Sequence, residues 1–538
     1  MPRKNRAARA TGMTWKMSRR RDASLPLYRQ VESLIHAGVA DGRLQPGERI
    51  PSVSDLGRLL GVNKVTVVRA FQELERAGIL SSHVGRGTFV SASPGAIRAG
   101  GTGSSSGADG SGGGAGSAFG SVTGSTASTG ARSEVQRAVR RLRESYAGGL
   151  RELLALPRPP GTINLGGGVP APETVTDETL ARLTHEALAS DPKRLFAYGG
   201  ATGLPEFREQ IAAWLRKRGT DVTPEQVIVT NGSQQAVMLL ACWALDQGRN
   251  ILCETPTFTG IPGAFSLVGH AVESVPWSGA AFDLAALESS PTARRGLFYV
   301  CPDFHNPTGQ TLDLGARKAV AEWAARADRI VVSDEIFRDL RFAGDEPPSL
   351  FSLLPPGRRV LVGSLSKNFM TGLRAGFLVA DQPLIRELAP FKRYMDLGSP
   401  ALTQAVAARW LAVGHEAHLE RVRTLYRERA YAAFEALDRH MPDGVRSTRP
   451  EGGFQLWVEL PPGLSSVDLY LKALERGVAI SPGPVHDVDG RYQNCFRLGY
   501  GHAGPRDLDR AIATLAGAFE ALRAREPNPS ATGLGLLV

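Results

Sequence analysis

Residues 91–131 divide this chain, because they are mostly Gly, Ser, Ala and Thr and include almost no large apolar side chain. Such a segment cannot bury enough apolar surface to offset the entropy of ordering, so we expect a flexible linker. A chain of 538 residues is also too long for one core. The expected division is a disordered basic tail at 1–24, a small domain at 25–90, the linker at 91–131, a large domain with an N-terminal helix at 132–398, a smaller domain at 399–525 and a disordered tail at 526–538.

The positive charge of the chain is concentrated before the linker. Residues 1–90 hold 16 Lys and Arg against 7 Asp and Glu, a net charge of +9, while the whole chain carries +10. Concentrated positive charge attracts a polyanion, and the balanced remainder is typical of a cytosolic enzyme. Because no apolar run is long enough for a membrane span and none follows the basic N-terminus as in a secretory signal, we expect a cytoplasmic protein.

Residues 25–90 have the pattern of a winged helix-turn-helix. Apolar residues recur at helical spacing in three successive stretches, which begin near Leu27, Val53 and Val67. Two short strand-like runs with a Gly-containing turn follow, at 79–90. The basic charge of this segment makes double-stranded DNA the expected partner, since a solvated helical face alone accounts less well for it.

Beyond the linker, β-branched runs alternate with helical patterns from about residue 160 to residue 400. This alternation predicts a mostly parallel sheet covered by helices on both faces. After residue 400 the pattern becomes helical and then mixed, which predicts a smaller α+β domain. The predicted fold class is therefore multidomain: a winged helix-turn-helix, an α/β domain and a small α+β domain.

Residues that follow the predicted strands indicate a cofactor site, since chemistry in a parallel sheet collects at the carboxyl ends of its strands. Gly232, Ser233 and Gln234 open a helix whose free N–H groups suit a phosphate, although Asn-Gly is also a common plain turn. Asp334 ends a buried strand and needs a cationic partner, either a protonated pyridine nitrogen or an Arg.

Lys367 lies in the run Ser364-Leu-Ser366-Lys, with Arg374 seven positions later. An amine beside hydroxyls and a guanidinium that hold a phosphate predicts a lysine that forms a Schiff base with pyridoxal 5'-phosphate. Asn306 could donate to the 3-hydroxyl of that cofactor and Phe258 could stack on its ring. A plain turn and a core aromatic are the alternatives for these two residues.

Residues 148–525 resemble a fold-type I, class I aminotransferase. The resemblance rests on Ile163 to Gly168, Tyr198 to Gly203, Asn306 to Gly309, Ser364 to Lys367 and Phe496 to Gly499. It implies that Lys367 is the catalytic residue that carries the aldimine, that Gly166 and Arg497 bind substrate, and that Arg497 receives a substrate carboxylate. The other cofactor-binding residues that it implies are Tyr198 of a partner subunit, Gly232, Ser233, Gln234, Phe258, Asn306, Asp334, Ser364, Ser366 and Arg374. The family usually has Tyr where this chain has Phe337, so one hydrogen bond to the 3-hydroxyl is expected to be missing.

Residues 25–90 are similar to the winged-helix domain of GntR-type regulators, on the motifs Gly47 to Ser52 and Gly85 to Val90. The helix that begins near Asn63 would enter the major groove. Ser54 stands where that family commonly has Arg, so base preference is expected to differ. The DNA-binding residues implied are Arg49, Ser52, Asn63, Lys64, Thr66 and Arg86.

A GntR-type DNA-binding domain joined to an aminotransferase-like domain resembles the arrangement of MocR-type regulators. The resemblance implies a homodimer that binds operator DNA and senses an amino acid or related amine by aldimine exchange at Lys367. A working aminotransferase that transfers an amino group from an amino acid to a 2-oxo acid is the alternative. A DNA-binding protein with a degenerate second domain is a third hypothesis.

Overall fold

The computed structural model describes residues 27–60, 62, 64–76, 79–83, 87–91, 158–278, 281–290 and 295–524. They fall into two units, on either side of residue 120. The predicted tails at 1–24 and 526–538, the predicted linker apart from Ser91, and the predicted helix before residue 158 lie outside the described residues. Within these ranges no helix is both long and apolar enough to cross a membrane.

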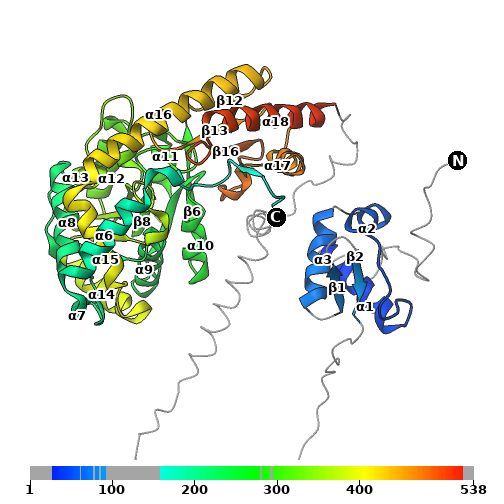
Figure 1. The fold of residues 1–538 in the computed structure, drawn as a ribbon, viewed down its shortest axis with the longest axis horizontal. Coiled ribbons are helices and arrows are strands. Elements are labelled where there is room, and N and C mark those ends of the chain that lie inside the picture. The colour runs from blue at the N-terminus through cyan, green and yellow to red at the C-terminus, as the bar shows by residue number, and fades with distance from the viewer. Residues whose placement is uncertain are drawn as a thin grey trace, which may run out of the picture. The chain divides into compact units, whose positions relative to one another are not determined.

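The N-terminal unit is a winged helix-turn-helix, as its sequence predicts (Figure 1). Buried Val31, Ile35, Leu56 and Val67 bring its three helices onto one core. The two strands pair antiparallel, from Leu80 opposite Val90 to His83 opposite Gly87. Its elements are α1 (Leu27–Ala40), α2 (Val53–Leu60), α3 (Lys64–Arg76), β1 (Leu80–His83) and β2 (Gly87–Val90).

The second unit is built on an eight-stranded, mostly parallel sheet, in the order β4-β11-β10-β9-β8-β5-β6-β7. β11 runs antiparallel to both its neighbours, and the strands from β10 to β6 are parallel. Strands covered on both faces read as continuous apolar runs, which is why the sequence predicts them well. The strands are β4 (Val227–Thr230), β5 (Asn250–Thr255), β6 (Val272–Ser278), β7 (Ala281–Phe282), β8 (Gly296–Val300), β9 (Ile330–Asp334), β10 (Arg359–Ser364) and β11 (Gly376–Ala380).

Helices cover both faces of this sheet. One face packs against α9 (Ser233–Asp246), α10 (Gly260–Leu267) and α14 (Gln382–Asp396). The other face packs against helices in two clusters. One cluster contains α6 (Asp177–Ser190), α8 (Pro205–Lys217) and α15 (Ala401–Val413). The other cluster contains α11 (Leu284–Ser289), α12 (Leu314–Ala325) and α13 (Leu350–Leu353). The short α7 (Pro192–Leu195) follows α6.

A smaller α+β domain surrounds a four-stranded antiparallel sheet, in the order β12-β13-β16-β15. In Figure 1, α16 and α18 lie side by side above this sheet. The elements are β12 (Arg446–Ser447), β13 (Gln455–Glu459), β15 (Ser481–Pro482), β16 (Cys495–Gly499), the parallel pair β3 (Ile163–Asn164) and β14 (Val478–Ala479), α16 (His415–His440), α17 (Ser466–Glu475) and α18 (Pro505–Arg523).

The expected division at residues 398 and 399 does not coincide with the packing. Trp410 and Leu411 of α15 are buried in the large-domain core, whereas Val422 and Tyr426 of α16 belong to the small-domain core. The rings of His415 and His418, at the start of α16, contact Trp214 and Trp410 of the large-domain core, so the two cores meet along α16. Apolar residues predict that a helix is buried but not which core receives it.

Candidate functional site

Lys367 lies just after the carboxyl end of β10, as predicted. Its Nζ donates a hydrogen bond of 2.5 Å to the backbone oxygen of Gly168. Burial, together with the positive charge of Arg497, lowers the pKa of Lys367 to about 8. A larger fraction of the amine is therefore unprotonated near neutral pH, which a nucleophilic lysine requires.

Asp334 is the last residue of the neighbouring strand β9, and its side chain is 1% exposed. Its carboxylate accepts hydrogen bonds from Tyr299 Oη (2.6 Å) and from the backbone N–H of Ile336 (3.3 Å). Burial raises the pKa of Asp334 to about 6. No Lys, Arg or His within the described ranges forms an ion pair with it, so this buried carboxylate suits a cation that the chain itself does not supply.

The turn between β4 and α9 has the geometry of an anion site. Gly232 has a φ of 80°, which strains other residues, and a Cβ there would lie 2.4 Å from Arg374 Nη2, so a side chain would also displace this guanidinium. Arg374 donates 3.2 Å to the backbone oxygen of Asn231 and 3.4 Å to Ser366 Oγ. Ser364 Oγ lies 3.0 Å from Ser366 Oγ. The guanidinium, the two hydroxyls and the N-terminus of α9 thus come together, as the sequence predicts.

A hydrogen-bonded cluster around Asp396 holds this turn, and the sequence analysis missed it. Asp396 Oδ2 accepts from Asn231 Nδ2 and from Gln235 Nε2, each at 2.8 Å. Lys392, whose side chain is fully buried, donates to both carboxylate oxygens at 2.7 Å. Gln235 Oε1 in turn accepts from the backbone N–H of Asn231 at 2.8 Å. Asn231 is therefore held by its side chain and by its backbone.

Arg497 on β16 completes the cluster from the small domain. Its Nη1 donates to Asn306 Oδ1 at 2.8 Å and its Nη2 to the backbone oxygen of Gly166 at 2.6 Å. Burial lowers the pKa of Arg497 to about 10, at which the guanidinium is still charged near neutral pH. Arg497 is thus in direct contact with Gly166, which was also expected to bind substrate, and with Asn306, which was expected at the 3-hydroxyl of the cofactor.

The other expected cofactor residues have different surroundings. Phe337 is 1% exposed and packs edge-to-face on Phe454 in the small-domain core, with ring centres 5.4 Å apart. Phe258 is half-buried against the core formed by α9 and α10. Gln234 donates to the backbone oxygen of Gly260 at 3.3 Å. Tyr198 is 89% exposed on the loop after α7.

Tyr299 is a further residue that the sequence analysis missed. It lies on β8, where Val332 of β9 is its register partner. A hydroxyl in an otherwise apolar strand was the only local signal, and it does not indicate which carboxylate accepts the hydrogen bond.

The N-terminal unit places some of the expected DNA-binding residues. Arg49 is exposed and forms a β-bridge with Phe89 of the wing. Ser52 Oγ accepts from the N–H of Asp55 and donates to its carboxylate, so this hydroxyl caps α2. Thr66 is half-buried on α3. This helix begins at Lys64, but the side chain of Lys64 lies outside the described part of the structure. Asn63 and Arg86 lie outside the described residues.

Two family models match the chain. Residues 160–515 match aminotransferase class I and II, and residues 27–90 match the bacterial regulatory proteins of the gntR family. The first match spans most of the second unit, and the second match spans the winged helix-turn-helix.

Individual relatives fall into two groups. The 2-aminoadipate transaminase of Thermus thermophilus is 37% identical over 70% of this chain and 94% of that protein. The probable rhizopine catabolism regulatory protein MocR of Rhizobium meliloti is 28% identical, over 95% of this chain and 97% of that protein. Among solved structures, the α-aminoadipate aminotransferase LysN of Thermus thermophilus superposes with a TM-score of 0.66 at 35% identity, over 72% of this chain and 97% of that one.

The cofactor follows from the family and from this geometry. The Thermus structure contains N-(5'-phosphopyridoxyl)-L-leucine. In this chain the buried carboxylate of Asp334, which has no ion-pair partner among the described residues, fits a pyridinium nitrogen. The anion site at Gly232 fits a phosphate, and Lys367, with its lowered pKa, fits an aldehyde. Pyridoxal 5'-phosphate is therefore the cofactor. Because one polypeptide contains a GntR-type DNA-binding domain and a class I and II aminotransferase domain, the chain belongs to the MocR-type subfamily of GntR transcriptional regulators.

Proposed function

We propose that this regulator senses an amino acid or related carboxylated amine at Lys367 and acts on operator DNA as a cytoplasmic homodimer. The observation that carries this proposal is the double hydrogen bond of Arg497, to Asn306 and to Gly166. It places a guanidinium that suits a carboxylate in the same cluster as a lysine of lowered pKa.

The chain's own residues hold the cofactor in this proposal. Pyridoxal phosphate supplies an aldehyde that condenses reversibly with amines. Asp334 would pair with its ring nitrogen, and the hydrogen bond from Tyr299 holds that carboxylate in place. Ser233, Ser364, Ser366 and Arg374 would hold the phosphate, and Asn306 would contact the 3-hydroxyl. Phe337 lacks the hydroxyl of the usual Tyr and packs in the core instead.

An amine that enters the site would compete with Lys367 for the cofactor aldehyde. Free Lys367 has a pKa of about 8, so both of its protonation states are populated near neutral pH and it can take up or release a proton there. The backbone oxygen of Gly168 accepts a hydrogen bond from the free Nζ, at 2.5 Å. If two conformations of the domain bind the amine with different affinities, binding of the amine shifts the equilibrium between these conformations.

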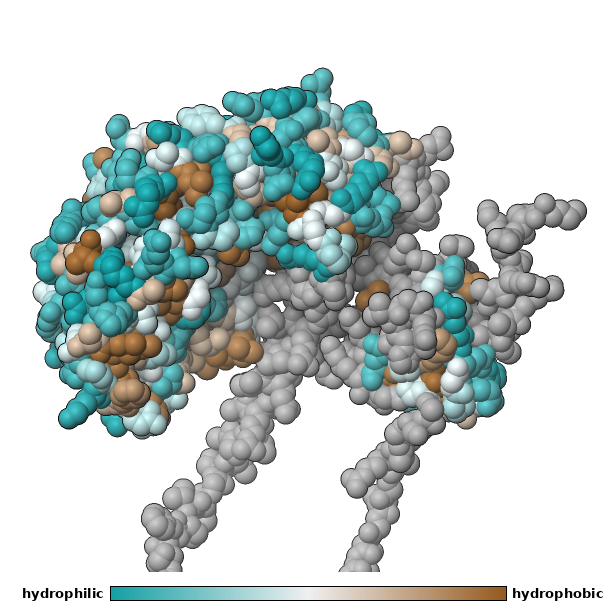
Figure 2. Space-filling view, viewed as in Figure 1, coloured by the Kyte–Doolittle hydropathy of each residue, from teal (hydrophilic) through white to brown (hydrophobic). Residues whose placement is uncertain are grey.

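A homodimer is supported by the surface around Tyr198. Large side chains on this surface are strongly exposed: Phe196 (87%), Tyr198 (89%), Tyr394 (89%) and Leu397 (53%). Gly398 lies against this segment, since a Cβ there would be 3.1 Å from the Gly199 oxygen. Figure 2 shows apolar residues gathered on the surface where Figure 1 places α14 and α15. In a dimer Tyr198 would reach the phosphate site of the partner.

Transaminase activity is the second candidate function. The transaminase relative and the presence of Lys367, Asp334 and Arg497 in one cluster favour it. The winged helix-turn-helix favours regulation as the main function.

Visible absorbance and DNA binding test the proposal together. We expect the purified protein to have a Schiff-base band that is absent from Lys367→Ala, and carboxylated amines to change both the band and operator affinity. Steady turnover of an amino acid with a 2-oxo acid, without sequence-selective DNA binding, would favour the transaminase. Absence of the band from the parent protein would overturn sensing at Lys367.

A further inference from the structure

Asn368, the residue after Lys367, is buried and joined to two other parts of the fold. Its side chain is 1% exposed, and its Nδ2 donates to Asp339 Oδ2 at 2.7 Å. Its backbone oxygen accepts a hydrogen bond from His418 Nε2 at 2.8 Å. The function proposed above uses neither contact.

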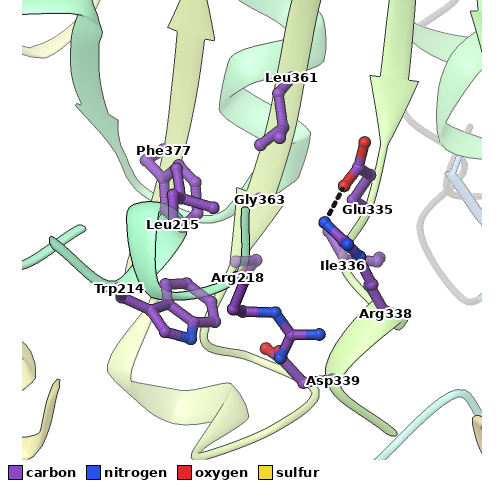
Figure 3. Close-up of a pocket in the computed structure, with 11 residues that line it drawn as sticks. Trp214, Leu215, Arg218, Glu335, Ile336, Arg338, Asp339, Leu361, Gly363 and Phe377 are labelled. Carbon is purple, nitrogen blue, oxygen red and sulfur yellow. Dashed lines mark hydrogen bonds and ion pairs between the residues drawn. The ribbon is translucent and has the colours of Figure 1, made fainter. Parts of the chain in front are cut away.

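Asp339 is a junction of several charged groups. It lies in the short 3-10 helix Arg338–Leu340 after β9, and its carboxylate also accepts from Arg218 at the end of α8. Arg423 of α16 donates to its backbone oxygen at 2.7 Å. Arg218 reaches on to Glu346 at 2.7 Å. In Figure 3 the side chains of Arg218 and Asp339 lie next to each other at the edge of a pocket.

The pocket in Figure 3 adjoins this junction. Its enclosed space is only about 20 Å³, between α8, the segment after β9 and strands β10 and β11. Trp214 Nε1, at its wall, is buried and has no hydrogen-bond partner among the described residues. Asp339 is 4% exposed, and its buried carboxylate is held by hydrogen bonds from Arg218 and Asn368.

His418 connects the same lysine loop to α16. His418 is 3% exposed, and its imidazole packs edge-on against the stacked rings of Trp410 and Phe369, with ring centres 5.5 and 5.8 Å away. Burial lowers the pKa of His418 to about 4, so the ring is neutral near pH 7. Because its partner is a backbone oxygen, Nε2 carries the hydrogen.

We propose that Asn368 is a positioning residue that transmits the state of Lys367 to α16, the helix along which the large-domain and small-domain cores meet. Movement of Lys367 pulls on the Asn368 backbone, and the contacts with His418 and Asp339 pass this displacement to α16. This inference rests on the proposed role of Lys367, and it names the route by which the occupied site alters the domain arrangement.

Hydrogen–deuterium exchange of residues 415–425 tests the route, with hydroxylamine as the probe. Hydroxylamine would form an oxime at the cofactor carbon that is bonded to Lys367 Nζ. The two hydrogens on the hydroxylamine nitrogen would pass to Nζ, which would become a free amine. In the parent protein we expect hydroxylamine to change the exchange rate of this segment about fivefold, the equivalent of one buried hydrogen bond. Asn368→Leu removes the contact with Asp339 but not the backbone contact with His418, so it should keep the visible band and its response to hydroxylamine but reduce the change in exchange.

Three further variants make the result specific. His418→Gln retains a donor and should keep the exchange response, whereas His418→Leu should reduce it. Asn494→Leu removes a hydrogen bond to Leu460 elsewhere in the small domain and should behave like the parent. An equal exchange response in the parent, Asn368→Leu and His418→Leu would overturn the inference alone. A parent band that does not respond to hydroxylamine would overturn the proposed function, and this inference with it.

Discussion

Asp334→Asn should stabilise the cofactor-free protein at neutral pH while weakening cofactor binding. Burial raises the pKa of Asp334 from 3.8 to about 6. The folded state therefore holds the proton more tightly than the unfolded state, and stability is lost as the pH rises from 3.8 through 6. Since each pH unit between the two values corresponds to about 1.4 kcal/mol, the ionised carboxylate costs about 3 kcal/mol above pH 6.

Asparagine removes this charge but keeps the shape of the side chain. The single carbonyl oxygen of asparagine can accept a hydrogen bond from either the Tyr299 hydroxyl or the Ile336 N–H. The remaining donor would face the amide nitrogen, which cannot accept a hydrogen bond. The lost hydrogen bond costs about 1 kcal/mol, which leaves a gain of about 2 kcal/mol at pH 7.5. This gain should shrink as the pH falls below 6, vanish near ~4.5 and become a loss of about 1 kcal/mol below 3.8, where aspartic acid is protonated in both states. Cofactor affinity should fall about tenfold or more, because a charge-assisted hydrogen bond is lost.

Urea unfolding followed by tryptophan fluorescence measures the effect. Of the 7 tryptophans only Trp15 lies outside residues 158–524, so the signal reports on the aminotransferase-like unit. Asp303→Asn is the matched control, because this equally buried carboxylate is paired with Arg317 at 2.7 Å and its loss should destabilise by about 3 kcal/mol. An Asp334→Asn protein less stable than the parent at pH 7.5, or a difference that is the same at pH 4.5, would refute the reasoning.

Three other substitutions have defined outcomes. Arg497→Lys can keep only one of two hydrogen bonds, so binding of amino acids should weaken about tenfold while binding of amines without a carboxylate is unchanged, as measured by titration of the visible band. Asp396→Ala leaves Lys392 buried without its carboxylate, and thermal unfolding should show a loss of about 3–5 kcal/mol together with weaker cofactor binding. Lys64→Ala should lower the salt dependence of DNA binding by about one unit of slope without changing the visible band. An unchanged slope would remove Lys64 from the phosphate contacts.

Local patterns of sequence were sufficient to predict the architecture and much of the site. The apolar spacing in residues 25–90 predicts the three helices and the wing, and alternating strands and helices predict the parallel sheet. Strand ends then bring Gly232, Asp334 and Lys367 to one edge, because parallel strands of one sheet share their carboxyl edge. These residues could be identified since their position depends on the order of elements.

Contacts between distant segments were decided by the tertiary structure alone. The hydrogen bond from Lys367 to Gly168 joins residues 199 positions apart, and the one from Asn231 to Asp396 joins residues 165 apart. Burial then shifts the pKa values of Asp334 and His418, and no sequence pattern states how deeply a given side chain lies. The spacing of residues along the chain determines which elements form, whereas the packing of those elements determines which charges meet and how far water is excluded from them.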